Sequence, residues 1–311
     1  VLRFLPLPLL RGLGWVLGKV LWLTASKRRK VVLTNQDMQV IGEGLSGPAN
    51  PLRGMTVATA SIVAAAEQAL DMAALPRSTM GRLIVGAGLA GVNLPEYYQQ
   101  FSAWQHPFAR LYLTSDLHIA CIGAHCGGDG AVIICGTGSC GLASVQGQLL
   151  DVGGHGFPYG DNGSGAWFGM QMLHKVLLSL DQLAEPTAMT GLLLQELAVH
   201  DSMGLVAHFM HASPTTYAKF APLVFVAAEA GDETALQLIQ QGAAFISAIA
   251  QRLLLAKPPR LSFIGGLAPK LLPYLPAAVQ QQVTPALQPP ELGAVWFARQ
   301  RSQAHSFTTS L

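Results

Sequence analysis

Three stretches of this chain run from a short apolar strand directly into glycines, and this pattern limits the folds open to it. They are RLIVGAGLAG at 82–91, AVIICGTGSCG at 131–141 and RLSFIGGLA at 260–268. Buried strands that end in turns with few side chains are typical of α/β proteins, in which ligands bind beyond the carboxyl ends of the strands. Strands and helical segments alternate between these stretches, and each half of the chain contains an antiparallel hairpin. The sequence therefore predicts an α/β protein of two similar lobes.

Composition supports a protein with a large core, because 50% of the 311 residues are hydrophobic and 12% are charged. A net charge of +2 excludes the strongly basic surface that nucleic-acid binding needs. The spacing of the four cysteines departs from that of zinc-binding pairs, so reduced thiols of a cytoplasmic protein are favoured over a zinc site. These cysteines are Cys121, Cys126, Cys135 and Cys140. We predict no metal ligands among the side chains.

The first 29 residues differ from the rest. Their apolar run is interrupted by Pro6, Pro8, Arg11 and Lys19, whereas a transmembrane helix needs about 20 apolar residues without charge. The segment also fits a signal peptide only weakly. We therefore treat residues 1–29 as an atypical segment and expect no membrane association. The abrupt change at Lys30 leads to the hypothesis that the reading frame is altered upstream of it.

The rest of the chain predicts regular elements. Strands are expected at 30–35, 38–47, 110–116 and 141–154, and helices at 55–75, 94–105, 117–126, 166–180, 187–256 and 290–302. Leu236, Ile239, Ala243, Ile246, Ala250 and Leu253 follow the spacing of a buried helical stripe.

The GTGS turn at 136–139 is a candidate phosphate site. Its glycines let the main chain approach a ligand, and successive N–H groups in such a turn attract an anion. The hydroxyls of Thr137 and Ser139 add hydrogen-bond donors. On this loop alone, a plain hairpin turn is the alternative.

Asp116 ends the segment TSD, directly after a predicted strand. A carboxylate in that place can take the proton of a substrate hydroxyl, a role worth roughly 10²–10⁴-fold in rate. A helix N-cap is the alternative, and the two roles are compatible.

Two further glycine-rich segments differ in strength as signals. GGHGFPYGDNGSG at 153–165 holds six glycines and suits recognition of a polyhydroxyl ligand, although a long surface loop is the alternative. GAGLAG at 86–91 matches the dinucleotide motif G-x-G-x-x-G. However, Asn93 and Pro95 place the next helix too late for that fingerprint.

From Lys30 onward the chain resembles the bacterial glucosamine and N-acetylglucosamine kinases. These belong to the sugar kinase, Hsp70 and actin superfamily, near the BadF/BadG-type ATPases. The resemblance rests on GPANPL, TSDLHIACIGAH, AVIICGTGSCG, GGHGFPYGDNGSGAWFGM and FIGGLA, in the family's order. It implies two actin-like (ribonuclease H-like) lobes around a central cleft that holds ATP and sugar. The expected parts are the atypical segment 1–29, an N-terminal lobe 30–116 completed by 290–311, and a C-terminal lobe 117–289.

The resemblance also implies roles for individual residues. Asp116 matches the base for the 6-hydroxyl of the amino sugar. The residues matching nucleotide-binding positions are Gly136, Thr137, Gly138, Ser139, Ala228, Gly265 and Gly266. Those matching sugar-binding positions are Asn50, Asp116, Ser139, Cys140, Gly154, His155, Gly156 and Asp161. The implied cofactors are ATP and Mg²⁺.

One departure from the family is clear. The family's first phosphate loop, DGGGT, holds the β- and γ-phosphates and positions Mg²⁺, but here no glycine occurs between Val20 and Ile41 and no acid precedes Asp37. The leading hypothesis is therefore an amino-sugar kinase whose activity is in doubt. The alternatives are a catalytically inactive sugar-binding or regulatory protein and an activator ATPase of a radical enzyme. Acyl preference and oligomeric state stay open, with a homodimer as one alternative.

Overall fold

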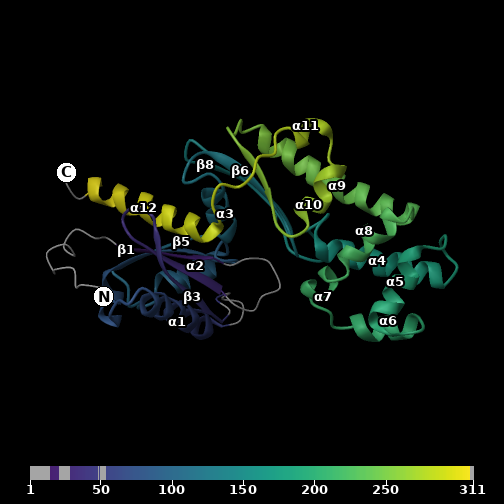
Figure 1. Ribbon diagram of the computed structural model, residues 1–311, viewed down its shortest axis with the longest axis horizontal. Coiled ribbons are helices and arrows are strands. Elements are labelled where there is room, and N and C mark those ends of the chain that lie inside the picture. The colour runs from purple at the N-terminus through teal and green to yellow at the C-terminus, as the bar shows by residue number, and fades with distance from the viewer. Residues whose placement is uncertain (1–14, 21–28, 48, 50–53, 309–311) are drawn as a thin grey trace, which may run out of the picture. The chain divides into compact units, whose positions relative to one another are not determined.

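The computed structural model describes residues 15–20, 29–47, 49 and 54–308, which form two compact units (Figure 1). Unit 1 combines the described residues up to Gly128 with residues 286–308, and unit 2 comprises Asp129–Pro285. The sequence placed the boundary at 116/117. The structure places it after Gly128, because helix α3 (Asp116–Ala124) packs against helix α12 (Pro290–Thr308) within unit 1.

Unit 1 is built on a five-stranded sheet in the order β3-β2-β1-β4-β5. Strand β2 pairs antiparallel with both β1 and β3, whereas β4 pairs parallel with β1 and β5 pairs parallel with β4. The strands are β1 (Trp15–Val20), β2 (Arg29–Thr34), β3 (Val40–Ser46), β4 (Leu83–Gly88) and β5 (Arg110–Thr114). The other elements are α1 (Met55–Met72), the 3₁₀ helix η3 (Arg77–Arg82) and α2 (Pro95–Ser102).

Strand β1 corrects the expectation for the N-terminal segment. It lies within residues 1–29, which predicted no regular element, and it takes the middle position of the sheet. Residues 1–14 and 21–28, on which the altered-frame hypothesis also rests, lie outside the described residues.

Unit 2 repeats this strand order in a four-stranded sheet, β8-β7-β6-β9. Its strands are β6 (Gly130–Cys135), β7 (Ser139–Val145), β8 (Gln148–Gly153) and β9 (Leu261–Ile264). An antiparallel meander is again followed by a strand parallel to the first, here β9 beside β6. The shared order agrees with the prediction of two similar lobes. The single strand predicted at 141–154 is instead two strands, separated by a turn with positive φ at Gln146 and Gly147.

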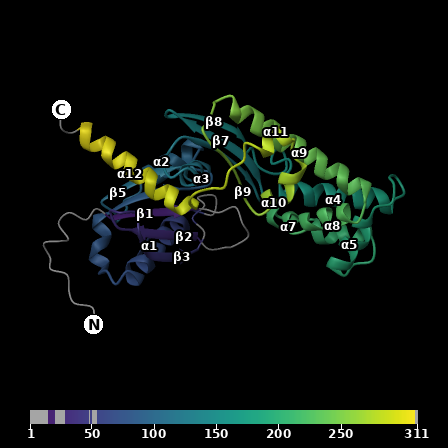
Figure 2. The same cartoon turned by 45° about the horizontal axis from the view of Figure 1, so that its top comes forward.

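Close helix packing covers both faces of the unit 1 sheet (Figures 1 and 2). A Cβ atom added to Gly44 of β3 would lie 1.9 Å from the carbonyl oxygen of Ala65 in α1. One added to Gly86 of β4 would lie 2.0 Å from the carbonyl oxygen of Ala294 in α12. The two helices therefore approach the strands at distances that only glycine permits.

Helices form most of unit 2. They are α4 (Gly165–Leu180), α5 (Ala188–Leu197), α6 (Ser202–Phe209), α7 (Pro214–Ala218), α8 (Ala221–Glu229), α9 (Glu233–Leu254), α10 (Ala268–Leu271), η4 (Leu272–Tyr274) and α11 (Ala277–Gln280). Helix α9 lies along the sheet (Figure 2). Its side chains Ile249 and Leu253 fill the space beside Gly141. Its predicted stripe is buried except for Leu236, which is 37% exposed while Ala235 is buried in its place. No helix of the described residues has the length and apolar character of a membrane span.

Asp232 caps two helices of unit 2 at once. Its Oδ1 accepts a 2.7 Å hydrogen bond from the N–H of Ala235, at the start of α9. Its Oδ2 accepts from the hydroxyl of Thr187 at 2.8 Å and from the N–H of Ala188 at 2.6 Å, at the start of α5. One carboxylate thus satisfies the free N–H groups of two helix ends.

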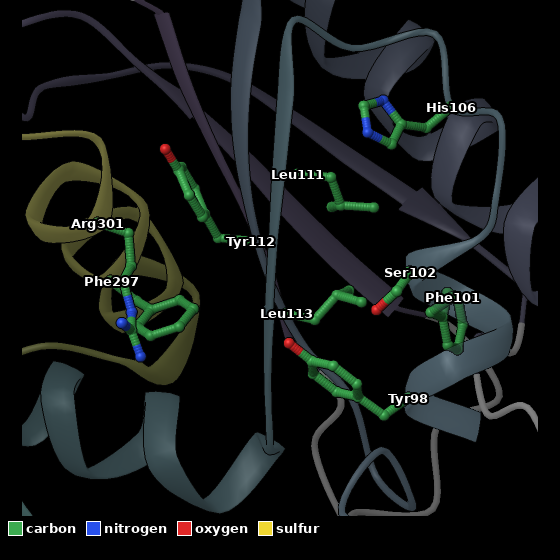
Figure 3. A pocket seen from close by; sticks show the side chains of 9 residues that line it. All are labelled: Tyr98, Phe101, Ser102, His106, Leu111, Tyr112, Leu113, Phe297 and Arg301. Carbon is green, nitrogen blue, oxygen red and sulfur yellow. The ribbon is translucent and has the colours of Figure 1, made fainter. Parts of the chain in front are cut away.

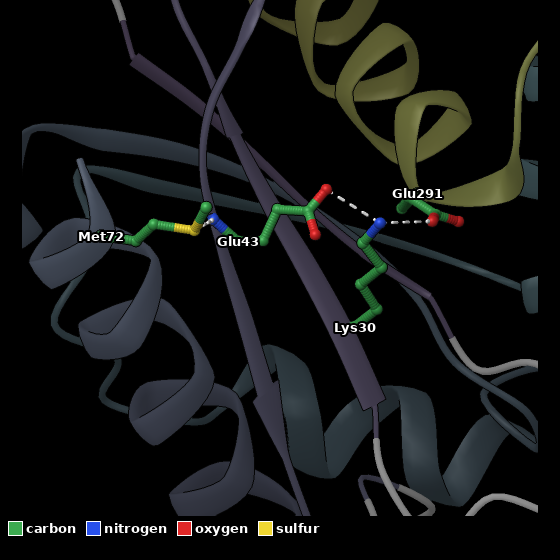
Figure 4. Close-up of polar contacts among 4 residues, drawn as sticks. All are labelled: Lys30, Glu43, Met72 and Glu291. Carbon is green, nitrogen blue, oxygen red and sulfur yellow. Dashed lines mark hydrogen bonds and ion pairs between the residues drawn. The ribbon is translucent and has the colours of Figure 1, made fainter.

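A three-charge network fixes the first turn of α12 to the unit 1 sheet (Figure 4). Lys30 Nζ lies 2.9 Å from Glu43 on β3 and 3.4 Å from Glu291, whose residue is only 7% exposed. The hydrogen bond with Glu43 is the main cause that raises the pKa of Lys30. The network compensates the burial of the Glu291 carboxylate, which would otherwise be costly.

Candidate functional site

The GTGS turn of unit 2 presents main-chain donors without partners. Residues 136–138 connect β6 to β7, and the N–H of Gly136 donates to the carbonyl of Gly138 at 2.9 Å. Within the described chain, the N–H groups of Thr137 and Gly138 donate to no other group. Gly138 is nevertheless buried. A buried N–H without a partner is costly, so this pair of donors favours an anion site over a plain hairpin turn.

The second half of the segment 153–165 holds this turn in place. The N–H groups of Gly165 and Ala166, which open α4, donate to the carbonyls of Gly136 at 2.7 Å and Thr137 at 3.1 Å. The Ser139 hydroxyl donates to the carbonyl of Asn162 at 2.8 Å. Sequence reasoning assigned this segment to sugar recognition and missed its role as a support. The sequence signal for this role was Ser164, a residue type that favours helix N-caps, and its hydroxyl does cap α4.

Asp161 is the charged residue of this junction. It adopts a positive φ of 61°, and its Oδ1 accepts a long 3.4 Å hydrogen bond from the N–H of Ser139. Its Oδ2 accepts no hydrogen bond from the described residues. Burial raises the pKa of Asp161, while the Ser139 N–H and the charge of His155 act in the opposite direction.

The first half of the segment lies beside the same turn. The N–H of Gly154 donates to the carbonyl of Ser139 at 3.3 Å. A Cβ on Gly154 would lie 3.2 Å from the Cβ of Cys140, which is 9% exposed. His155 is exposed, and Gly156 accepts a main-chain bond from Gly160. The predicted sugar positions of unit 2 therefore adjoin the predicted phosphate turn.

The glycine pair after β9 meets the end of β6. Gly265 has a φ of 110°, and a Cβ there would lie 2.3 Å from the carbonyl oxygen of Cys135. The N–H of Leu267 donates to the same oxygen at 3.1 Å. Gly266 has open space where a side chain would be. The structure thus brings Gly265 and Gly266, which match nucleotide-binding positions, against Cys135, the residue that precedes Gly136.

Ala228 lies on a helix whose Phe225 is near the segment that follows Gly265 and Gly266. It is half-buried on α8, one turn after Phe225. The ring of Phe225 lies 5.7 Å from the Nζ of Lys270, which belongs to the helix that follows the glycine pair.

Asp116 belongs to unit 1, where it is the first residue of α3. The N-cap alternative is wrong in detail, because the Ser115 hydroxyl accepts the 3.1 Å bond from the N–H of His118. The Asp116 carboxylate accepts from the N–H of Leu117 at 2.9 Å and is half-buried. Thr114 and the Nδ1 of His118, 2.8 Å apart, connect the strand to the helix on either side of Asp116.

Other sequence expectations have mixed outcomes. Asn50 lies outside the described residues. After GAGLAG the next helix begins at Pro95, so the motif does not open a helix directly. None of the four cysteines forms a disulfide, and the described residues contain no group of three or more His, Cys, Asp or Glu side chains placed to hold a metal ion.

A groove of unit 1 follows the outer strand β5 (Figure 3). Tyr112, Phe297 and Arg301 lie on one side of this strand, and Leu111, Leu113 and Tyr98 on the other. The groove measures about 340 Å³ and adjoins a second hollow of about 430 Å³ lined by Thr114 and Ser115. The candidate residues of unit 2 line neither hollow.

Comparisons with known proteins identify the family of this chain. Residues 26–298 match the BadF/BadG/BcrA/BcrD ATPase family. Over 266 residues the chain is 35% identical to the glucosamine kinase GspK of Vibrio cholerae, covering 86% of this chain and 90% of that protein. A shorter region, 33% of this chain and 34% of the relative, is 37% identical to the N-acetyl-D-glucosamine kinase of Dictyostelium discoideum.

A solved structure from Chromobacterium violaceum, provisionally described as an N-acetylglucosamine kinase, superposes with a TM-score of 0.83 at 27% identity. The match covers 92% of this chain and 99% of that one. A ROK glucokinase of Streptomyces griseus matches with a TM-score of 0.52 at 15% identity over 92% of this chain and 99% of its own, which shows the fold alone. The predicted α/β fold with two actin-like lobes is confirmed.

Proposed function

Because the chain belongs to the BadF/BadG/BcrA/BcrD ATPase family, we propose that it is an ATP-dependent kinase for the 6-hydroxyl of glucosamine or N-acetylglucosamine. Its similarity to a named glucosamine kinase over nine-tenths of that protein supports the substrate class. The single observation that carries the proposal is the supported turn at 136–139, where Thr137 and Gly138 keep unpaired N–H groups. Such donors fit the phosphates of ATP.

The proposal gives different tasks to the residues. Thr137, Gly138 and the α4 junction hold the phosphates, while Gly265 and Gly266 leave room for the adenosine because they carry no side chain. Asp116 takes the proton of the sugar hydroxyl as the phosphoryl group is transferred. Asn50, Cys140, Gly154, His155, Gly156 and Asp161 bind the sugar, and Ala228 adds a nucleotide contact. Mg²⁺ would be held chiefly by the ATP phosphates and would neutralise their charge.

A coupled assay of ADP release tests the proposal. Wild-type protein should release ADP when glucosamine or N-acetylglucosamine is added, and release little without a sugar. Asp116→Asn should lower the rate by at least about 100-fold. In calorimetry it should change sugar affinity by no more than about threefold, because the amide keeps the size of the side chain. Asp71→Asn, at an exposed carboxylate of unit 1 paired with Arg77, is the matched control.

A second candidate is a sugar-binding protein without kinase activity. It is favoured by the segment between Val20 and Ile41, which has no glycine to approach a triphosphate. Sugar binding without sugar-dependent ADP release would favour this candidate and contradict the kinase. ATP hydrolysis that no sugar stimulates would instead favour the activator ATPase.

A further inference from the structure

One carboxylate joins two segments of unit 2 that have different predicted ligands. Asp161 belongs to the predicted sugar segment, yet its Oδ1 contacts the N–H of Ser139 in the phosphate turn. A Cβ on Gly138 would lie 2.9 Å from its Oδ2, so the carboxylate lies directly against the turn. The other hydrogen bonds of this junction involve no N–H group of the turn. The Ser139 hydroxyl donates to the carbonyl of Asn162, and the N–H groups of Gly165 and Ala166 donate to carbonyls of the turn.

The two carboxylate oxygens of Asp161 differ in the hydrogen bonds that they accept. Oδ1 receives one long hydrogen bond, whereas Oδ2 receives none from the described residues. Burial raises the pKa of Asp161, which means that its charge is poorly compensated in the absence of ligands. A half-buried carboxylate in that situation gains from a further hydrogen-bond donor. A sugar hydroxyl or amino group is such a donor.

We propose that Asp161 is a positioning residue that couples the two substrates. Oδ1 restrains Ser139, so that the N–H groups of Thr137 and Gly138 stay available to phosphate, and Oδ2 accepts a hydrogen bond from the sugar. A sugar that orders this carboxylate then orders the phosphate turn, and the two ligands strengthen each other's binding reciprocally. This inference rests on the proposed function, in which both ligands bind to this unit.

Three variants separate the two halves of the inference. Asp161→Ala removes both oxygens. Asp161→Asn keeps an oxygen for the Ser139 N–H but loses the charge and the second acceptor. Asp151→Ala, in the neighbouring strand β8, removes a carboxylate of unit 2 that has no bond to the turn and is the control.

Two measurements suit these variants. Amide hydrogen exchange of peptides covering 136–139 reports the restraint without any ligand or turnover. Calorimetry with Mg-ADP, with and without glucosamine, reports the coupling. In wild type we expect glucosamine to tighten ADP binding about fivefold. Asp161→Ala should accelerate exchange in 136–139 and weaken ADP binding about tenfold, with no effect of the sugar.

Asp161→Asn should keep the exchange protection and stay within about twofold of wild type in ADP affinity, while the effect of the sugar disappears. Unchanged protection in Asp161→Ala would overturn the restraint. Absence of a sugar effect in wild type, its persistence in Asp161→Asn, or a change only in the Mg²⁺ requirement would overturn the coupling. If the wild-type protein releases no ADP with either sugar, the proposed function fails, and the exchange data still decide the restraint.

Discussion

Two glycine-rich turns of this protein look alike in sequence but serve different ends. GTGS in unit 2 follows the buried strand β6, whereas GAGLAG in unit 1 begins within the buried strand β4, which ends at Gly88. In GTGS, Thr137 and Gly138 keep N–H groups without partners. In GAGLAG, Gly86 admits the main chain of α12, and a Cβ on Gly88 would lie 2.1 Å from the side chain of Ile119. Glycine at the end of a strand therefore permits a close approach, by a helix in GAGLAG and, in the proposed function, by a ligand in GTGS.

The segments that follow the turns account for the difference. Helix α4 donates its first N–H groups to the carbonyls of Gly136 and Thr137. It offers no acceptor to the N–H groups of Thr137 and Gly138, which donate to none of the described residues. After GAGLAG the chain forms further turns before α2 begins at Pro95. The space beside its glycines is filled by α3 and α12. Four experiments test this contrast.

Gly86→Ala should have the largest effect, a loss of about 3 kcal/mol in the free energy of unfolding. The added Cβ meets the carbonyl oxygen of Ala294, a main-chain atom that moves only with α12. Urea denaturation measures the change. Gly81→Ala, with no atom nearer than 4.0 Å, is the control and should stay within about 0.5 kcal/mol. Equal stability of Gly86→Ala and wild type would remove the packing role of GAGLAG.

The pH dependence of unit 1 should follow His118, which belongs to the helix that packs on GAGLAG. Burial, assisted by the charge of Arg301, lowers the pKa of His118 from 6.5 to about 4. Between pH 4 and 6.5 this histidine is protonated in the unfolded chain and neutral in the folded protein. The free energy of unfolding is therefore highest above pH 6.5 and decreases as the pH falls toward 4. We expect a loss of about 2 kcal/mol after allowance for partial exposure. In His118→Gln this part of the pH profile should flatten, and an unchanged profile would contradict the assignment.

Gly138→Ala should weaken nucleotide binding about tenfold and leave stability within about 1 kcal/mol. Its φ permits alanine, and the added Cβ meets the carboxylate of Asp161, which can shift at the expense of its bond to Ser139. Calorimetry with Mg-ADP measures the affinity. Gly191→Ala, on α5 with nothing within 4 Å, is the control for unit 2. A large loss of stability in Gly138→Ala would mean that both glycine turns serve packing.

Asp161→Asn should have the smallest effect on stability. The charge of Asp161 lowers stability as the pH rises, whereas that of His118 lowers it as the pH falls. Because burial raises the pKa of Asp161, its charge costs stability as the pH rises above 3.8. The variant should therefore be slightly more stable than wild type at pH 7, by less than about 1 kcal/mol or about 2 °C in Tm. The difference should vanish below pH 3.8. Calorimetric scans at pH 3.5 and 7 test this, and a variant less stable than wild type at pH 7 would contradict it.

Most of the fold was predictable because local periodicity specifies it. The hairpin around Gln36, the strand at 82–88 and the helix from Met55 all have the predicted type. Strand β1 was missed because Arg, Lys and Pro made residues 1–29 unlike the rest, and its place in the sheet depends on pairing with β2 and β4. Leu236 was placed in the buried stripe of α9 because periodicity alone does not separate positions one residue apart.

The candidate site was predictable in its parts and not in its assembly. Glycines at 136 and 138 and the acid at 116 were recognisable from residue type and position after strands. The contact of Asp161 with the turn was not predictable, because the hydrogen bond that its Oδ1 accepts from the N–H of Ser139 spans 22 positions of the chain. Likewise, the choice of Ser115 over Asp116 as the cap of α3 depends on the main-chain geometry at one residue.

The sequence by itself determined the type of most strands and helices after Lys30, the positions of the glycine turns and the similarity to a kinase family. These properties depend on residues that are neighbours in the chain. Only the tertiary structure decided which glycine turn keeps N–H groups that donate to none of the described residues. The reason is that the segments that fold against a turn decide which of its groups are used: α4 donates to carbonyls of GTGS and not to its N–H groups, whereas α12 fills the space beside Gly86.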